Sequence, residues 1–165
     1  MSVRLSFARL AVLGAAGALL LAAARPGGAQ ARTLDKKVLS LSAAHTIAAA
    51  AKEAARTRGV EVVIVVVDDA GIPLLLERMD GAQVASVNVG IGKARTAAIY
   101  RRPSRVFEEQ VRDGRVAALA LADATPLQGG VPVLLDGRVV GAIGVSGDTP
   151  QVDEDIAIAG ARAFD

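Results

Sequence analysis

The chain has 165 residues, of which 52% are hydrophobic and 22% are charged, and it contains no Cys or Trp. This length and apolar content fit one domain with a buried core, and they exclude a chain that is disordered throughout or stapled by disulfide bonds. Because only 2% of the residues are aromatic, a surface that stacks the bases of single-stranded nucleic acid is not expected.

The N-terminal segment has the features of a secretory signal peptide. Arg4 and Arg9 give it a positive start, residues 10–24 are all apolar or small, and Ala29-Gln30-Ala31 matches a cleavage site. The apolar run of 15 residues is shorter than the ~20 that a membrane-spanning helix needs. We therefore expect residues 1–31 to be removed on export, leaving one domain over residues 32–165 without a membrane span. The expected location is periplasmic or extracellular.

Cleavage would also change the charge of the protein. The whole chain has a formal charge of +2, but removal of Arg4, Arg9 and Arg25 leaves 16 basic against 17 acidic residues. A mature chain with a formal charge of −1 has no electrostatic attraction for duplex nucleic acid.

The mature chain begins with a predicted helix and a predicted hairpin. The helix covers residues 42–58, with Ser40 or Ser42 as its N-cap and Gly59 directly after its end. The residues expected on its buried face are Ala43, Ala44, Ile47, Ala51 and Ala54. Two strands, residues 60–67 and 72–79, then flank a turn that contains Gly71.

The rest of the chain predicts helices followed by a second hairpin. One helix covers residues 83–100, a shorter one 104–112, and a further helical turn 117–122. The residues expected on the buried face of the first of these are Val87, Ile91, Ala94 and Ala98. Strands at 131–135 and 138–146 follow, and Thr149 and Pro150 begin a last helix. Tight hairpins pair strands antiparallel, so the predicted class is α+β, with helices flanking one antiparallel sheet.

The common catalytic and nucleotide-binding motifs are absent. Gly90-Ile91-Gly92-Lys93 resembles part of a phosphate-binding loop, but Val87 and Ala94 stand where the motif needs Gly and Ser or Thr. There is one His and no G-x-S-x-G sequence for a nucleophilic Ser. We expect a binding protein rather than an enzyme.

Two segments could provide ligands for iron or for an anion. His45 is either a haem or metal ligand or a solvated surface histidine beside Lys52 and Arg56. In the second segment, Arg78 could bind a carboxylate with two hydrogen bonds. Met79 could contact a ligand or weakly bind iron. Alternatively, Arg78 pairs with Asp80 to close the turn, and Met79 fills the core.

The long middle helix offers a second possible anion site. Ser86, Lys93 and Tyr100 recur on one helix face, with Thr96 beside them. This face either binds an anion or is an ordinary exposed surface. We further expect Arg78 and Lys93 to flank one small pocket.

Glycines and acids near the second hairpin allow two interpretations as well. Gly129, Gly130 and Ser146 could present backbone N–H groups to an anion, or they could simply shape turns. Asp153 and Glu154 could contact a ligand, or they could stabilise the start of the last helix through its dipole.

Six segments in sequence resemble one known family. They are Val67-Asp68-Asp69-Ala70-Gly71, Glu77-Arg78-Met79-Asp80-Gly81-Ala82, Lys93-Ala94-Arg95-Thr96-Ala97, Arg102-Pro103-Ser104, Gly129-Gly130-Val131-Pro132, and Gly141-Ala142-Ile143-Gly144-Val145-Ser146-Gly147. Their order and spacing are similar to those of the GlcG/HbpS-like haem-binding family, which includes the C-terminal domain of PduO-type proteins. The similarity runs from about residue 39 to residue 164.

The resemblance implies a profilin-like α/β sandwich that assembles into homo-oligomers. For secreted members it also implies haem binding, in a haem-handling or sensing role. Besides His45, the residues that could then ligate iron are Met79, Tyr100 and an oxygen such as that of Thr96. Other members belong to pathways of small organic acids or diols. The resemblance therefore also allows an enzyme or accessory protein that acts on a small carboxylate or carbonyl compound.

Overall fold

A computed structural model describes residues 35–164 of the chain. The expected signal peptide, residues 1–31, lies outside the described residues. The described elements, in chain order, are α1 (Leu41–Arg58), β1 (Val63–Asp68), β2 (Pro73–Arg78), α2 (Ser86–Ile99), α3 (Arg105–Arg112), the 3₁₀ helix η1 (Val116–Ala120), β3 (Gly130–Leu135), β4 (Arg138–Ser146) and α4 (Pro150–Arg162). None of the helices in this part of the chain is both long and apolar enough to cross a membrane.

The strands form one antiparallel sheet in the order β2-β1-β4-β3. Each hairpin pairs its own two strands, and β1 pairs with β4 to join the hairpins at the centre of the sheet. The predicted succession of helix, hairpin, helices, hairpin and helix is confirmed, and so is the α+β class.

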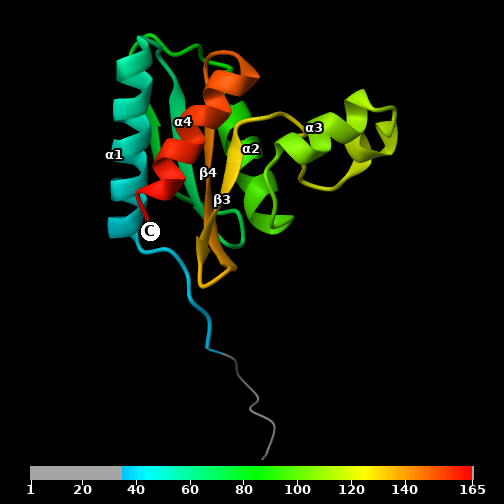
Figure 1. Cartoon of the computed structure of the whole chain (residues 1–165), viewed down its shortest axis with the longest axis horizontal. Coiled ribbons are helices and arrows are strands. Elements are labelled where there is room, and N and C mark those ends of the chain that lie inside the picture. Colours follow the sequence, from blue (N-terminus) through cyan, green and yellow to red (C-terminus); the bar gives the residue numbers. More distant parts are fainter. Residues whose placement is uncertain (1–34, 165) are drawn as a thin grey trace, which may run out of the picture. The chain divides into compact units, whose positions relative to one another are not determined.

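Helices lie on both faces of the sheet (Figure 1), and alternate residues of the segment 62–67, which runs into β1, supply the two layers of core. Val62, Ile64 and Val66 pack toward α1 and α4, whereas Val63, Val65 and Val67 pack toward α2. All six are fully buried, which explains why the sequence shows a continuous apolar run here instead of an alternating one. Helices therefore cover both faces of the sheet.

The ends of α1 and α4 follow from local chemistry. The Ser40 hydroxyl accepts a hydrogen bond from the N–H of Ala43, and Gly59 ends α1 in the left-handed conformation, with φ of 68°. The Thr149 hydroxyl caps α4 in the same way, with Pro150 at its first position. These are the caps that the sequence predicts.

The buried face of α2 matches the prediction only in part, since Ala94 and Ala98 are buried as expected. Val87 and Ile91 are only partly buried, whereas Ser86, Gly90 and Lys93 are buried. The cause is a close approach of two backbones: a Cβ on Gly144 of β4 would overlap the carbonyl oxygen of Gly90 and the backbone of α2. Small residues at this contact bring the helix onto the sheet along a face that carries polar side chains.

Candidate functional site

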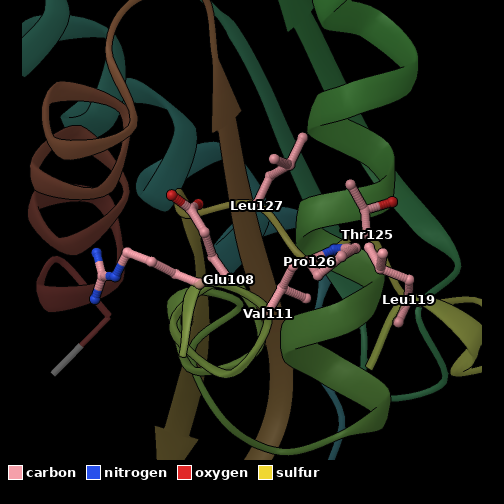
Figure 2. Close-up of a pocket in the computed structure, with 8 residues that line it drawn as sticks. Glu108, Val111, Leu119, Thr125, Pro126 and Leu127 are labelled. Carbon is pink, nitrogen blue, oxygen red and sulfur yellow. The ribbon is translucent and has the colours of Figure 1, made fainter. Parts of the chain in front are cut away.

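The larger pocket of the two that we describe lies beside α3. It has a volume of about 640 Å³ and is lined by residues from α3, η1 and the segment before β3: Glu108, Val111, Arg112, Leu119, Ala124, Thr125, Pro126 and Leu127. Figure 2 shows Glu108 and Val111 on α3, with Leu119 and residues 125–127 gathered around them. We call this the α3 pocket. Most of its lining is aliphatic, and its volume suits a ligand with a large apolar surface.

Two buried hydroxyl groups hold the loop that forms one wall of the α3 pocket. The Thr96 hydroxyl donates to the carbonyl of Gly92 (2.7 Å) and accepts from the N–H of Thr125 (2.7 Å). The Ser104 hydroxyl donates to the carbonyl of Leu127 (2.6 Å) and accepts from the N–H of Gly130 (2.8 Å). Thr96 and Ser104 are both fully buried. The wall is thus fixed near both ends by side chains that lie outside the pocket.

A buried ion pair lies next to this loop. The ammonium group of Lys93 donates to a carboxylate oxygen of Asp153 (2.7 Å) and to the carbonyl of Val145 (3.0 Å). Lys93 is 4% exposed and Asp153 is 2% exposed. Burial raises the pKa of Asp153 above its ordinary value of 3.8, although the Lys93 ammonium opposes the shift. A Cβ on Gly129 would lie 2.9 Å from the Lys93 nitrogen, so this ion pair needs glycine beside it.

Glu154 joins the same region to α3. One of its carboxylate oxygens accepts from the guanidinium of Arg105 (3.2 Å), and the other accepts from the side-chain amide of Gln128 (2.6 Å). The backbone N–H of Gln128 in turn donates to the carboxylate of Glu108. This network links α4, the loop before β3 and the α3 pocket. Together with the ion pair of Lys93 and Asp153, it indicates that Asp153 and Glu154 do more than stabilise the start of a helix.

A second, smaller and polar pocket contains the segment around Arg78. Its volume is about 280 Å³, and its lining is charged apart from Met79: Lys52, Arg56, Glu61, Glu77, Arg78, Met79 and Asp80. Lys52 forms an ion pair with Glu77. Among the described residues, no ion pair joins Arg78 to Asp80. The alternative in which that pair closes the turn is therefore wrong, and Met79 packs only partly against the core.

The remaining predicted site residues are dispersed. Neither described pocket is lined by both Arg78 and Lys93, because the Lys93 ammonium is turned toward Asp153 and is buried. The expectation of one pocket between these two residues is therefore wrong. Ser146 is buried and pairs with Val63, which also pairs with Arg78. Ser146, Val63 and Arg78 therefore lie side by side on three neighbouring strands, at the end of the sheet where β2 ends.

The aromatic and imidazole candidates lie apart from Lys93. The hydroxyl of Tyr100 donates to the carbonyl of Ala122 (2.7 Å), and its ring packs edge-on against Phe107 at 5.0 Å between centroids. His45 is exposed on α1 and lines neither described pocket. Within residues 35–164, no three His, Cys, Asp or Glu side chains gather closely enough to hold a metal ion.

Reasoning from the sequence missed the apolar lining of the α3 pocket. Leu119 and Leu127 line this pocket and are both exposed in the structure, but their segment has no clear helical period that would have marked them in the sequence. Exposed apolar residues in a cluster are typical of a ligand or partner surface.

Comparison with known proteins places the chain in one family. A family model described as "Haem degrading protein HbpS-like" matches residues 39–162. Protein GlcG of Escherichia coli K12 is 43% identical over 111 residues, which cover 67% of this chain and 83% of GlcG.

Solved structures agree with this result. A double mutant of Streptomyces reticuli HbpS superposes with a TM-score of 0.75 and 30% identity, over 95% of this chain and 97% of HbpS. A complex of PduOC with haem has a TM-score of 0.70 and 28% identity, over 76% of this chain and 94% of PduOC. These findings confirm the resemblance given by the six sequence segments, and the chain belongs to the HbpS-like family.

Proposed function

We propose that the protein binds haem, or a closely related planar ligand, in the α3 pocket. The observation that carries the proposal is the pocket itself, an open and mostly aliphatic space of about 640 Å³. Its volume lies within the ~300–1,000 Å³ of typical small-molecule sites. The family description names haem, and the related PduOC has been solved with haem bound. We propose a binding role rather than a catalytic one.

The lining of the α3 pocket fits the macrocycle better than it fits the iron. Val111, Leu119 and Pro126 offer apolar contact, whereas the polar groups are those of Glu108, Arg112 and Thr125. No His, Met or Tyr is among the lining residues, so oxygen would be the local ligand type. When bound, haem would supply a redox-active iron centre. The residues of the pocket would hold it mainly by covering its apolar faces.

His45 enters this proposal only through assembly. Because it is exposed on α1 and lines neither described pocket, it would reach a haem in the α3 pocket only from another subunit. We propose that the protein forms homo-oligomers. Native mass spectrometry of the wild type and of His45→Ala, each with and without hemin, tests both points. A monomer with unchanged hemin occupancy in His45→Ala would contradict them.

A hemin titration followed by absorbance tests the binding site. Leu119 lines the pocket and is 61% exposed, so Leu119→Glu places a charge there with little risk to folding. Val84 is 76% exposed and lines neither described pocket, which makes Val84→Glu the matched control.

We expect a stoichiometric shift of the Soret band in the wild type and in Val84→Glu. Leu119→Glu should bind about tenfold more weakly, because a loss of ~1.4 kcal/mol of apolar contact gives that factor. The absence of a stoichiometric shift in the wild type, or equal affinities of the two variants, would contradict the proposal.

The polar pocket favours a second candidate function, the binding of a small carboxylate by an enzyme or accessory protein. This pocket of about 280 Å³ is lined by three cations, Lys52, Arg56 and Arg78, and by three carboxylates. Lys52 is paired with Glu77, whereas Arg78 forms no ion pair among the described residues and is the cation that could bind the acid. Calorimetry with a panel of small hydroxy acids should show binding that Arg78→Ala removes. Arg138→Ala, at an exposed position of β4, should leave it unchanged. If no acid binds, or if both variants behave alike, this candidate is ruled out.

We also propose that the protein acts after export, in the periplasm or outside the cell. The support is the signal-peptide pattern of residues 1–31. Mass spectrometry of the protein recovered from cell fractions should find an N-terminus near Arg32 outside the cytoplasm. Recovery of the intact chain only from the cytoplasm would contradict this.

A further inference from the structure

We propose that Arg112 and Glu108 make the α3 pocket selective for a ligand that carries a carboxylate at its edge, and that they orient this edge toward Arg112. The inference rests on the proposed function, because it concerns the same pocket. It adds the chemical feature of the ligand that the protein recognises and the residues that recognise it.

The two residues are placed to act together. Glu108 and Arg112 are four positions apart on α3, so they lie on the same side of the helix, and both line the pocket. Val111 lines the pocket between them in sequence, and Pro126 and Leu127 lie across from α3 (Figure 2). An apolar ligand seated on these residues would therefore have its edge beside one cation and one anion.

The guanidinium of Arg112 is available to a ligand. Its one ion pair within residues 35–164 is with Asp113, at 4.0 Å, and the two side chains are 69% and 74% exposed. An ion pair this long and this exposed contributes little. A ligand carboxylate could replace it with two parallel hydrogen bonds, which are stronger and more directional.

The carboxylate of Glu108 has the opposite role. One of its oxygens accepts from the backbone N–H of Gln128, which fixes the group at the pocket. Among the described residues, no Lys, Arg or His lies within ion-pair distance of it. The nearby Arg105 is already engaged by Glu109 and Glu154. The negative charge of Glu108 therefore repels a ligand carboxylate from its own side of the pocket.

Hemin and its dimethyl ester separate this charge recognition from apolar contact, because the ester has the same macrocycle without the two carboxylates. The variants are Arg112→Gln and Glu108→Gln, and the second keeps an oxygen that can accept from Gln128. Arg115→Gln is the control, since Arg115 is an exposed neighbour that does not line the pocket. Both ligands are titrated at low and at high salt.

We expect Arg112→Gln to weaken hemin binding about three- to tenfold and Glu108→Gln to strengthen it about twofold. Neither variant should change binding of the ester, Arg115→Gln should change neither ligand, and high salt should reduce the differences. The opposite signs of the two effects are a readout that a merely structural role of either residue would not produce.

Three results would overturn the inference. Equal losses of hemin and ester in Arg112→Gln would show that this residue contributes packing only. An Arg115→Gln variant as weak as Arg112→Gln would show unspecific attraction. Unchanged or weaker hemin binding in Glu108→Gln would remove the role of Glu108. These three leave haem binding standing, whereas a wild type that binds neither compound would refute the proposed function as well.

Discussion

Removal of the positive charge from the buried ion pair should strongly destabilise the protein. In Lys93→Met, the side chain keeps its approximate length, but the Asp153 carboxylate loses the ammonium at 2.7 Å. Asp153 is only 2% exposed, so water cannot replace that partner. Breaking a buried pair in this way costs about 3–5 kcal/mol. That loss is a large part of the ~5–15 kcal/mol that stabilise a typical domain.

Urea unfolding followed by circular dichroism measures this loss, since the chain has no Trp for fluorescence. The double variant Lys93→Met/Asp153→Asn removes both charges, and it should lose less free energy of unfolding than Lys93→Met alone. If Lys93→Met costs less than about 1 kcal/mol, or if the effects of the two substitutions simply add, the pair is not the buried and coupled unit described above.

The same pair predicts a pH dependence. Because burial raises the folded-state pKa of Asp153 above 3.8, the folded protein takes up this proton at a higher pH than the unfolded chain does. The contribution of Asp153 to stability should therefore increase as the pH falls through the raised pKa, and it should level off below 3.8. Asp153→Asn should lack this component. Stability profiles of the wild type and Asp153→Asn that stay parallel as the pH falls toward 3.8 would contradict the raised pKa.

Three further substitutions test the packing of the fold and the pocket wall. Gly144→Ala should cost about 1–3 kcal/mol in urea unfolding, because its Cβ would overlap the carbonyl oxygen of Gly90; a neutral effect would contradict the close backbone contact. Thr96→Val should cost about 1–3 kcal/mol and weaken hemin binding, because the N–H of Thr125 loses its buried acceptor. Unchanged hemin affinity would show that the hydrogen bond between Thr96 and Thr125 does not shape the pocket. Thr149→Ala should cost about 1 kcal/mol through loss of the α4 cap, and a calorimetric melting temperature equal to that of the wild type would contradict it.

Most of the fold could be predicted from local sequence signals. The cap at Ser40, the left-handed Gly59 and the Thr149-Pro150 helix start act within a few residues, and the structure shows each of them as expected. The pairing of β1 with β4 is not local. This pairing follows if the two hairpins share one core. However, neither hairpin alone contains a sequence signal for the order of the four strands in the sheet.

The buried face of α2 could be predicted only in part. Val87 and Ile91 belong to an apolar stripe at helical spacing, and such a stripe is usually buried. The actual packing is set by Gly90 against Gly144, residues that are far apart in the sequence. Lys93 becomes buried only because Asp153 of α4 meets it, and no single segment contains that information.

The candidate site was the hardest part to predict, for a related reason. Sequence reasoning favours residues with charged or polar groups, such as Arg78 and Lys93. In the structure Arg78 lines the polar pocket, whereas Lys93 is buried against Asp153. The α3 pocket is lined mainly by aliphatic residues, and such residues do not by themselves indicate a binding site. It becomes visible only when α3 and the loop held by Thr96 and Ser104 are brought together.

Hydrogen–deuterium exchange with and without hemin would locate the ligand most directly. If haem binds in the α3 pocket, hemin should slow exchange of backbone amides in residues 108–127, where α3, η1 and the pocket loop lie. Residues 77–80 of the polar pocket should gain no protection. Protection confined to α1 or to the polar pocket, with residues 108–127 unchanged, would contradict the assignment of haem to the α3 pocket.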